Sequence, residues 1–187
     1  MILPTDTVYG VSADPENREA VQRLYDAKGR GEEKPLQLLL GDPSWLDSVA
    51  VSLTPEARRL AAAFFPGGIT LVVKKGPTVP DDIVSGGTTV GVRVPDHPLC
   101  LQIVKAFGRP LAASSANKSG KPSPRTAQEA AEQLGELVDL VFDGGPSAAG
   151  RDSTVIDATD TPVRILREGA VAREEIERVL GGRVGWT

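Results

Sequence analysis

The chain has 187 residues, 21 of them basic and 25 acidic, which gives a net charge of −4 at pH 7. This length favours a single domain, and the acidic balance argues against a protein whose whole surface grips nucleic acid. The sequence has no apolar run of about 18 residues and no secretory signal. One cysteine excludes an internal disulfide, and one histidine excludes a zinc site built from several Cys and His ligands. We therefore expect a cytoplasmic protein without a membrane span.

Helix signals occur five times along the chain. Asp14 and Thr54 are predicted N-caps, each followed by a proline at the first helical position, and Thr126 begins a capping box. Gly29 and Gly135 are predicted to end their helices. The predicted helices lie within residues 14–30, 53–68, 97–108, 125–135 and 173–182.

Short β-branched or apolar runs between these helices read as strands. They cover residues 35–40, 69–74, 89–95, 110–114, 138–143, 153–158 and 163–166. Helices interleaved with strands predict an α/β fold, and several strands in succession favour an open mixed sheet with flanking helices. No internal repeat or linker divides the chain, so we expect one domain over residues 1–187.

Polar residues cluster at the ends of these elements, where binding residues tend to lie on a rigid scaffold. One cluster has Gly145 and Gly150 at P-loop spacing, but Arg151 and Asp152 stand where Lys and Ser or Thr are required. A strand follows where a P-loop needs a helix, so a turn between strands is the better interpretation. The clusters are residues 4–10, 28–35, 86–95, 114–124 and 144–155.

Single residues in these clusters are ambiguous. Lys28 and Arg30 by themselves suit a last helical turn, where cations complement the helix dipole. Beside several hydroxyl-rich loops they also form a credible clamp for a polyphosphate. His97 is predicted to cap a helix and Cys100 to lie in the core. The residues alone therefore indicate a pocket for a small anionic ligand.

Seven motifs in order resemble the YrdC-type threonylcarbamoyl-AMP synthases, over residues 4 to about 180. They are PTDTVYG, Lys28-x-Arg30, FFPGGITLVV, TVGVRVPDHP, Ser115-x-Asn117 with SGKPSP, STVID and ILREGA. The resemblance implies an open twisted α/β sheet with a concave, positively lined face. It also implies that L-threonine, bicarbonate and ATP react to give L-threonylcarbamoyl-adenylate and pyrophosphate. The adenylate would feed a threonylcarbamoyl transferase complex that modifies an adenosine of tRNA.

The resemblance also assigns roles to single residues. Lys28 and Arg30 would hold the phosphates and the developing charge as the catalytic pair, with Mg²⁺ bound to ATP. The threonine-binding residues would be Thr7, Arg93, Ala113 and Ser153. The nucleotide-binding residues would be Arg30, Lys34, Thr89, Ser115, Asn117, Ser123 and Arg167. Tyr9 and Gly10 are expected to be structural.

Three features depart from the family pattern. Leu39 aligns with a histidine of many relatives, so we expect a missing threonine contact and a lower threonine KM for Leu39→His. Gly31 replaces a proline after Arg30, which should loosen that loop. Only Ile2 and Leu3 precede Pro4 as apolar residues. We expect them to pin the motif poorly, and we expect the chain to lack N-terminal residues found in relatives.

Two other functions remain open at this point. A module of the same fold could bind double-stranded RNA or tRNA without catalysing a reaction, with an affinity that falls as the salt concentration rises. A related enzyme could pass carbamoyl groups to another acceptor, binding ATP without preferring threonine. An inactive family member is a further alternative.

Overall fold

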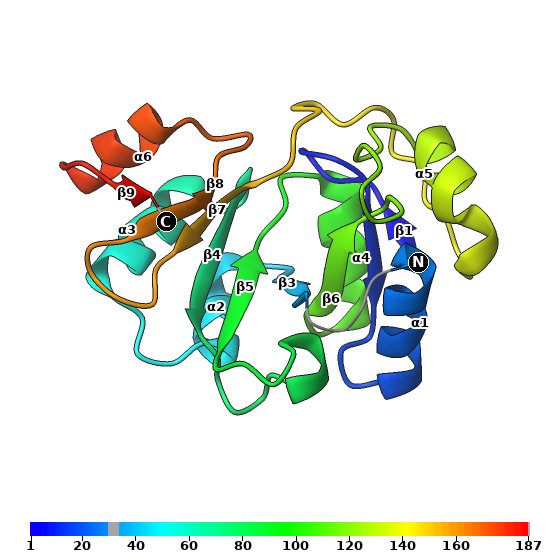
Figure 1. Ribbon diagram of the computed structural model, residues 1–187, viewed down its shortest axis with the longest axis horizontal. Coiled ribbons are helices and arrows are strands. Elements are labelled where there is room, and N and C mark those ends of the chain that lie inside the picture. Colours follow the sequence, from blue (N-terminus) through cyan, green and yellow to red (C-terminus); the bar gives the residue numbers. More distant parts are fainter. Residues whose placement is uncertain (30–33, 187) are drawn as a thin grey trace.

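The computed structural model describes residues 1–29 and 34–186 (Figure 1). In these residues nine strands form one sheet in the order β1-β2-β6-β3-β5-β4-β7-β8-β9. The pairs β3–β5, β4–β7 and β8–β9 are parallel and the others antiparallel, which confirms the predicted open mixed sheet. The strands are β1 Ile2–Leu3, β2 Gly10–Ala13, β3 Gln37–Leu39, β4 Ile69–Lys74, β5 Thr89–Arg93, β6 Leu111–Ser115, β7 Thr154–Asp157, β8 Arg164–Arg167 and β9 Gly185–Trp186.

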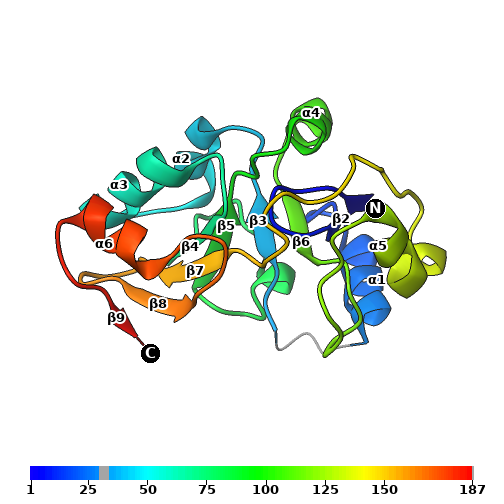
Figure 2. The same cartoon turned by 90° about the horizontal axis from the view of Figure 1, so that it is seen from above.

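Two groups of helices flank the ends of the sheet, and α4 lies beside the inner strands β3 and β6 (Figures 1 and 2). α1 and α5 lie beside β1 and β2, whereas α3 and α6 lie near β8, and the chain ends at the opposite side from its start (Figures 1 and 2). The helices are α1 Arg18–Lys28, α2 Leu46–Val49, α3 Pro55–Phe64, α4 Pro98–Phe107, α5 Ala127–Leu134 and α6 Arg173–Leu180. The described residues also include three short 3₁₀ turns: η1 Pro43–Trp45, η2 Asp81–Ile83 and η3 Gly135–Leu137.

The helix starts test the predicted caps. Thr54 caps α3 by accepting from the Ala57 amide at 3.0 Å, as predicted, and Thr126 caps α5. The prediction for α1 is wrong, because Asn17 is its N-cap. Asp14 instead accepts from the Glu16 amide at 3.0 Å, a local turn that delays the helix by one turn.

One predicted strand does not form. Residues 138–143 make a single bridge in which Val141 faces Ile2. Two backbone hydrogen bonds pair the run with β1: Ile2 N donates to Leu140 O, and Phe142 N donates to Ile2 O. The sequence prediction missed β1, β2, α2 and β9, because runs of two to four residues carry too little periodicity to identify them.

The start of the chain is held on both sides, and the expectation of a poorly pinned motif is wrong. Ile2 and Leu3 are fully buried and pair with β2, while residues 140–142 hold Ile2 on its other edge. Met1 O also accepts from the Ser12 amide at 2.8 Å. This double pairing anchors the backbone that leads into Thr5 and Thr7.

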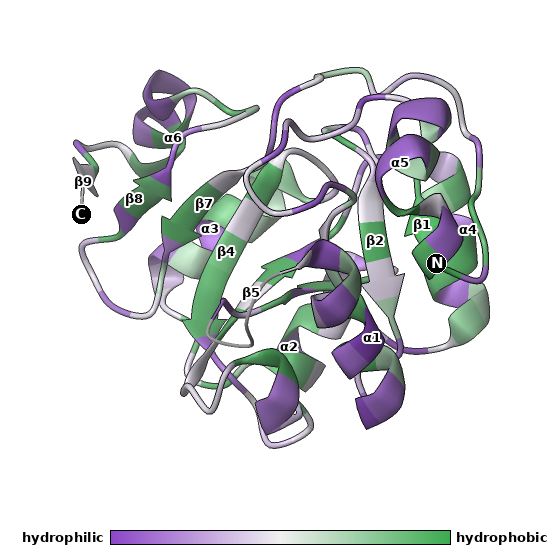
Figure 3. Cartoon of the chain, turned by 45° about the vertical axis from the view of Figure 1, so that its right-hand side comes forward, coloured by the Kyte–Doolittle hydropathy of each residue, from purple (hydrophilic) through white to green (hydrophobic). Residues whose placement is uncertain are grey.

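The core lies between the strands and the inner helix faces. The strands are largely hydrophobic, whereas α1 and α5 carry hydrophilic outer faces (Figure 3). A smaller apolar cluster joins α4 to the sheet and includes Leu39 and Cys100. Cys100 is fully buried, as predicted, and burial raises the pKa of its thiol to about 12. The described residues include no helix that is long and apolar enough to cross a membrane.

Candidate functional site

A cleft of about 370 Å³ opens over the middle strands of the sheet. The strands β3, β4, β5 and β6 form its floor, and the start of β7 and the end of β8 form one wall. The predicted site residues that line it are Thr7, Thr89, Arg93, Ala113, Ser115, Ser153 and Arg167. The structure therefore brings seven predicted residues from distant motifs into one place.

Thr7 and Arg93 form the first wall of the cleft. The Arg93 guanidinium is buried on β5 and donates to Thr7 Oγ1 at 2.6 Å and to Gly67 O at 3.0 Å. It also forms an ion pair of 2.5 Å with Asp6 Oδ1. Burial lowers the pKa of Arg93, and the Asp6 carboxylate opposes that change. Asp6 thus compensates a buried charge that holds Thr7 in position.

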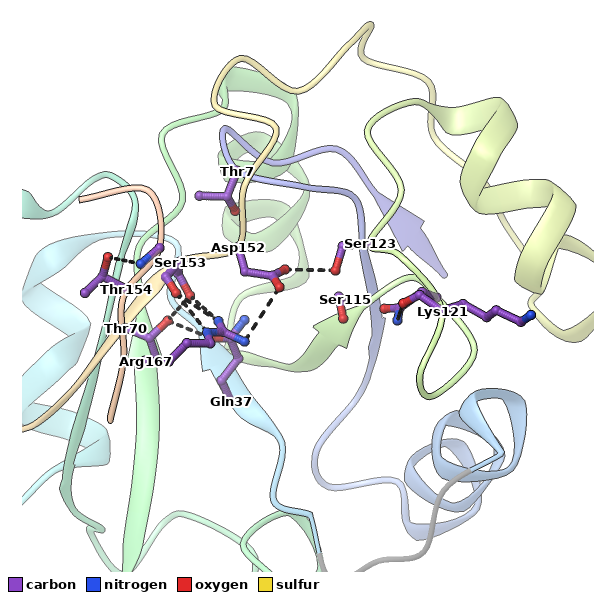
Figure 4. Close-up of polar contacts among 12 residues, drawn as sticks. Thr7, Gln37, Thr70, Ser115, Lys121, Ser123, Asp152, Ser153, Thr154 and Arg167 are labelled. Atoms are coloured by element: carbon purple, nitrogen blue, oxygen red, sulfur yellow. Dashed lines mark hydrogen bonds and ion pairs between the residues drawn. The ribbon is translucent and has the colours of Figure 1, made fainter. Parts of the chain in front are cut away.

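Ser153 stands on the opposite wall. Its hydroxyl lies 2.8 Å from Thr70 Oγ1, and the Thr70 hydroxyl donates to Gln37 Oε1 at 2.9 Å. Arg167 donates to the Ser153 carbonyl at 2.9 Å and to its hydroxyl at 3.3 Å. β3, β4, β7 and β8 each contribute to or adjoin this chain of contacts (Figure 4).

Asp152 connects that wall to the loop that precedes α5. Its Oδ1 accepts from the Ser123 hydroxyl at 3.0 Å, and its Oδ2 lies 3.8 Å from Arg167 Nη1 (Figure 4). Ser123 is therefore joined to the cleft through Asp152. Because Asp6 faces Arg93 and Asp152 faces Arg167, the charges of both arginines are balanced by carboxylates.

Lys28 has a different position from the one predicted for a phosphate clamp. Its side chain is buried and its ammonium donates to Ser115 O at 2.5 Å and Asn117 O at 2.9 Å. The Asn117 amide in turn donates to Lys121 O at 2.7 Å. Both residues thus hold the loop after β6 from inside. Their direct contact with nucleotide stays a prediction.

The remaining predicted residues divide in three ways. Lys34 is exposed and lies outside the cleft lining. Arg30 and Gly31 lie outside the described residues. Leu39 is 1% exposed and belongs to the apolar cluster under α4, so it does not line the cleft. An imidazole at that position would meet apolar side chains, which contradicts the expectation that Leu39→His supplies a threonine contact.

Gly169 explains why a glycine stands in the ILREGA motif. A Cβ on Gly169 would lie 2.1 Å from Asp152 O and 2.6 Å from Ser153 O, closer than any side chain tolerates. The Gly169 amide donates to Thr154 Oγ1 at 2.8 Å. This close approach lets the chain after β8 lie against the backbone that carries Asp152 and Ser153.

Four residues of the site were not identified from sequence: Asp6, Gln37, Thr70 and Asp152. Two of them were visible in the quoted motifs, since Asp6 lies within PTDTVYG and Asp152 directly precedes STVID. Gln37 is the one polar residue of PLQLLL, which is an unusual residue for a strand buried on both faces. Only the tertiary structure shows that the Gln37 side chain meets Thr70 of β4.

The donor set for a cation is small. Among the described residues, no group of three His, Cys, Asp or Glu side chains could hold a metal ion. Asp152 is the one carboxylate among the described residues that line the cleft. This donor set suits a Mg²⁺ ion that is bound mainly by substrate phosphates and water.

Comparisons with known proteins agree with this geometry. The family model Sua5_yciO_yrdC, described as telomere recombination, matches residues 1–169. A threonylcarbamoyl-AMP synthase of Pyrococcus abyssi is 43% identical over 96% of this chain and 53% of its own length. A putative threonylcarbamoyl-AMP synthase of Mycobacterium tuberculosis is 41% identical over 97% of this chain and 83% of its own length.

A solved structure is also similar. It is P. abyssi Sua5 complexed with L-threonine, with a TM-score of 0.94, 41% identity, and coverage of 98% of this chain and 54% of that one. The chain thus spans about half the length of the P. abyssi relative. The sequence, the sheet and the cleft all lead to one classification: the chain belongs to the Sua5/YciO/YrdC family.

Proposed function

We propose that this chain is an L-threonylcarbamoyladenylate synthase. The observation that carries the proposal is its likeness to P. abyssi Sua5 complexed with L-threonine, at a TM-score of 0.94. The cleft supports it, because balanced charges beside both donors and acceptors suit a zwitterion such as an amino acid. Thr7, Arg93, Ala113 and Ser153 would surround the threonine.

The reaction joins three substrates. The threonine amine, in its neutral form, attacks the carbon of bicarbonate to give a carbamate, and water leaves. A carbamate oxygen then attacks the α-phosphorus of ATP, and pyrophosphate leaves with the electron pair of the broken P–O bond. The products are threonylcarbamoyl-AMP, pyrophosphate and water. Such a transfer depends on positioning and charge neutralisation more than on a covalent nucleophile.

The nucleotide would lie toward the loop after β6. Ser115 ends β6 there, Thr89 and Arg167 also line the cleft, and Asp152 accepts a hydrogen bond from Ser123 in that loop. Arg30 and Lys34 would approach the phosphates from the segment after α1, while Lys28 orders the loop from below. Mg²⁺ bound with ATP would neutralise phosphate charge, and Asp152 is the one carboxylate among the described residues that line the cleft.

The product implies a partner. A mixed anhydride of a carbamate and a phosphate is reactive, so a transferase complex would take threonylcarbamoyl-AMP and transfer the threonylcarbamoyl group to an adenosine of tRNA. Both partners belong to the cytoplasm in this proposal.

Pyrophosphate release provides the test. Purified protein with ATP and Mg²⁺ should release pyrophosphate only when both L-threonine and bicarbonate are present. Release that continues without threonine would refute the proposal and indicate an ATPase or another carbamoyl acceptor. Salt-sensitive RNA binding without ATP turnover would instead indicate the RNA-binding alternative.

A further inference from the structure

One side chain of α5 holds the loop that follows β6. Gln133 Oε1 accepts a hydrogen bond from the Lys118 amide at 3.1 Å, and Gln133 Nε2 donates to Pro122 O at 3.1 Å. A side-chain amide carries both an acceptor and donors, so one glutamine can bond two backbone groups of opposite kind. The two contacts span 15 and 11 residues of sequence. They therefore tie both ends of the segment 118–122 to the helix that comes after it.

Other contacts hold the same segment from different elements. Asn117 Nδ2 donates to Lys118 O at 3.1 Å and to Lys121 O at 2.7 Å, and the Ser119 amide donates to Lys28 O at 2.9 Å. Asn117 belongs to the loop itself and Lys28 to α1. Gln133 thus adds an anchor on a third element.

Ser123 lies between two anchored prolines. Pro122 O accepts from Gln133, and Pro124 O accepts from the Tyr9 amide at 2.9 Å. A proline ring fixes φ near −65°, so few backbone angles remain free between these two anchors. The direction in which the Ser123 side chain leaves the loop is therefore determined by Gln133 on one side and Tyr9 on the other.

We propose that Gln133 is a positioning residue for the nucleotide and that it acts through Ser123. The Ser123 hydroxyl points to Asp152, which lines the cleft, at 3.0 Å (Figure 4). Gln133 itself does not line the cleft and lies outside the seven motifs. The inference deepens the proposed function and rests on it for the identity of the ligand.

Three variants of α5 separate the two hydrogen bonds of Gln133. Gln133→Met keeps a long, unbranched helix-forming side chain and removes both bonds. Gln133→Glu keeps an oxygen that accepts from the Lys118 amide but has no donor for Pro122 O. Gln128→Met is the matched control, because Gln128 is an exposed glutamine of the same helix that donates to Glu132 Oε1 at 3.1 Å.

Amide hydrogen exchange in the unliganded protein tests the contact itself. The Lys118 amide should exchange about fivefold faster in Gln133→Met than in the wild type, the factor that corresponds to a hydrogen bond of about 1 kcal/mol. Gln133→Glu should stay within about twofold of the wild type. The Ala116 amide, which donates to Tyr9 O at 2.8 Å, is the internal reference. Equal Lys118 exchange in the wild type and Gln133→Met would overturn the inference.

Binding measurements test the positioning role. In calorimetric titration with ATP and Mg²⁺, the Kd for ATP should be about fivefold higher in both Gln133 variants, because both lose the anchor on Pro122. The Kd for L-threonine should stay within about twofold, since Thr7 and Ser153 are held by Arg93 and Thr70. Gln128→Met should bind both ligands like the wild type. If Gln133 had a merely structural role, its loss would weaken both ligands alike or lower the melting temperature without changing the Kd for ATP, and either result would overturn the inference.

The two proposals fail in different ways. The expected pattern of ATP binding without pyrophosphate release in the presence of threonine and bicarbonate would refute the proposed function alone. An unchanged Kd for ATP in Gln133→Met, with normal pyrophosphate release, would refute the role of Gln133 alone. A wild-type protein that binds no ATP would overturn both.

Discussion

The ion pair between Asp6 and Arg93 offers the most demanding test of how the site is held. Asp6→Asn keeps the size of the side chain but removes the negative charge opposite a guanidinium whose side chain is 3% exposed. Breaking a buried pair in this way leaves an uncompensated charge and costs about 3–5 kcal/mol. A domain has a total unfolding free energy of about 5–15 kcal/mol, so a large part of its stability depends on this contact.

The lower end of that range applies to Asp6→Asn. The asparagine oxygen can still accept from Arg93 and from the Asp96 amide, which lies 3.0 Å from Asp6 Oδ1. We therefore expect a loss of about 3 kcal/mol in the unfolding free energy from urea titration. In protein that remains folded, the KM for threonine in the proposed reaction should rise more than the KM for ATP, because Arg93 positions the Thr7 hydroxyl.

The matched control is Asp47→Asn. It removes a pair of 2.9 Å with Arg58, whose side chain is 57% exposed, as is Asp47 at 65%. Solvent screens such a pair, so its loss should change the unfolding free energy little. If Asp6→Asn cost no more than Asp47→Asn, the reasoning that burial makes the Arg93 pair essential would be refuted.

Four further changes test other parts of the structure. Lys28→Met should lower the unfolding free energy by about 1–3 kcal/mol for each carbonyl that is left without a donor. The control Lys118→Met, in the loop after β6, should leave the unfolding free energy unchanged. Equal urea midpoints for the two variants would contradict the buried role of Lys28. Leu39→His should destabilise the protein by about 1–3 kcal/mol without lowering the threonine KM, since the imidazole would be buried among apolar side chains. Because burial raises the pKa of Cys100 to about 12, iodoacetamide at pH 8 should label it only after unfolding, and rapid labelling of native protein would refute its burial. Gly169→Ala should lower both stability and turnover, because its Cβ would meet backbone; an unchanged melting temperature would show that this approach is looser than described.

Local signals in the sequence predicted the elements whose cause is itself local. Thr54 and Thr126 were identified as caps because a cap needs only a side-chain oxygen and an amide a few residues away. Apart from β2, the strands of four to six residues were found from their apolar runs. Asp14 was wrongly predicted to be the N-cap of α1 because Asp, Pro and Asn all favour both turns and helix starts. Asn17, three residues later, is the N-cap.

The seven motifs in order were enough to predict the family, and seven of the predicted site residues line one cleft. Sequence order could not say what each side chain faces. Lys28 turned inward to the Ser115 and Asn117 carbonyls because the loop after β6 folds over the end of α1. Leu39 sits under α4, away from the cleft lining, because α4 covers that end of β3.

The sequence by itself determined which chemical groups this protein possesses: hydroxyls, two arginines and a loop of small residues, spread over most of the chain. Only the tertiary structure decided their pairing, because Asp6 meets Arg93 across 87 residues and Gln37 meets Thr70 across 33. The direction of a hydroxyl's hydrogen bond depends on which neighbours have already used their protons. Gln37 lies on β3, Thr70 lies on β4, and Ser153 directly precedes β7, so the order and register of these strands bring Thr70 between Gln37 and Ser153.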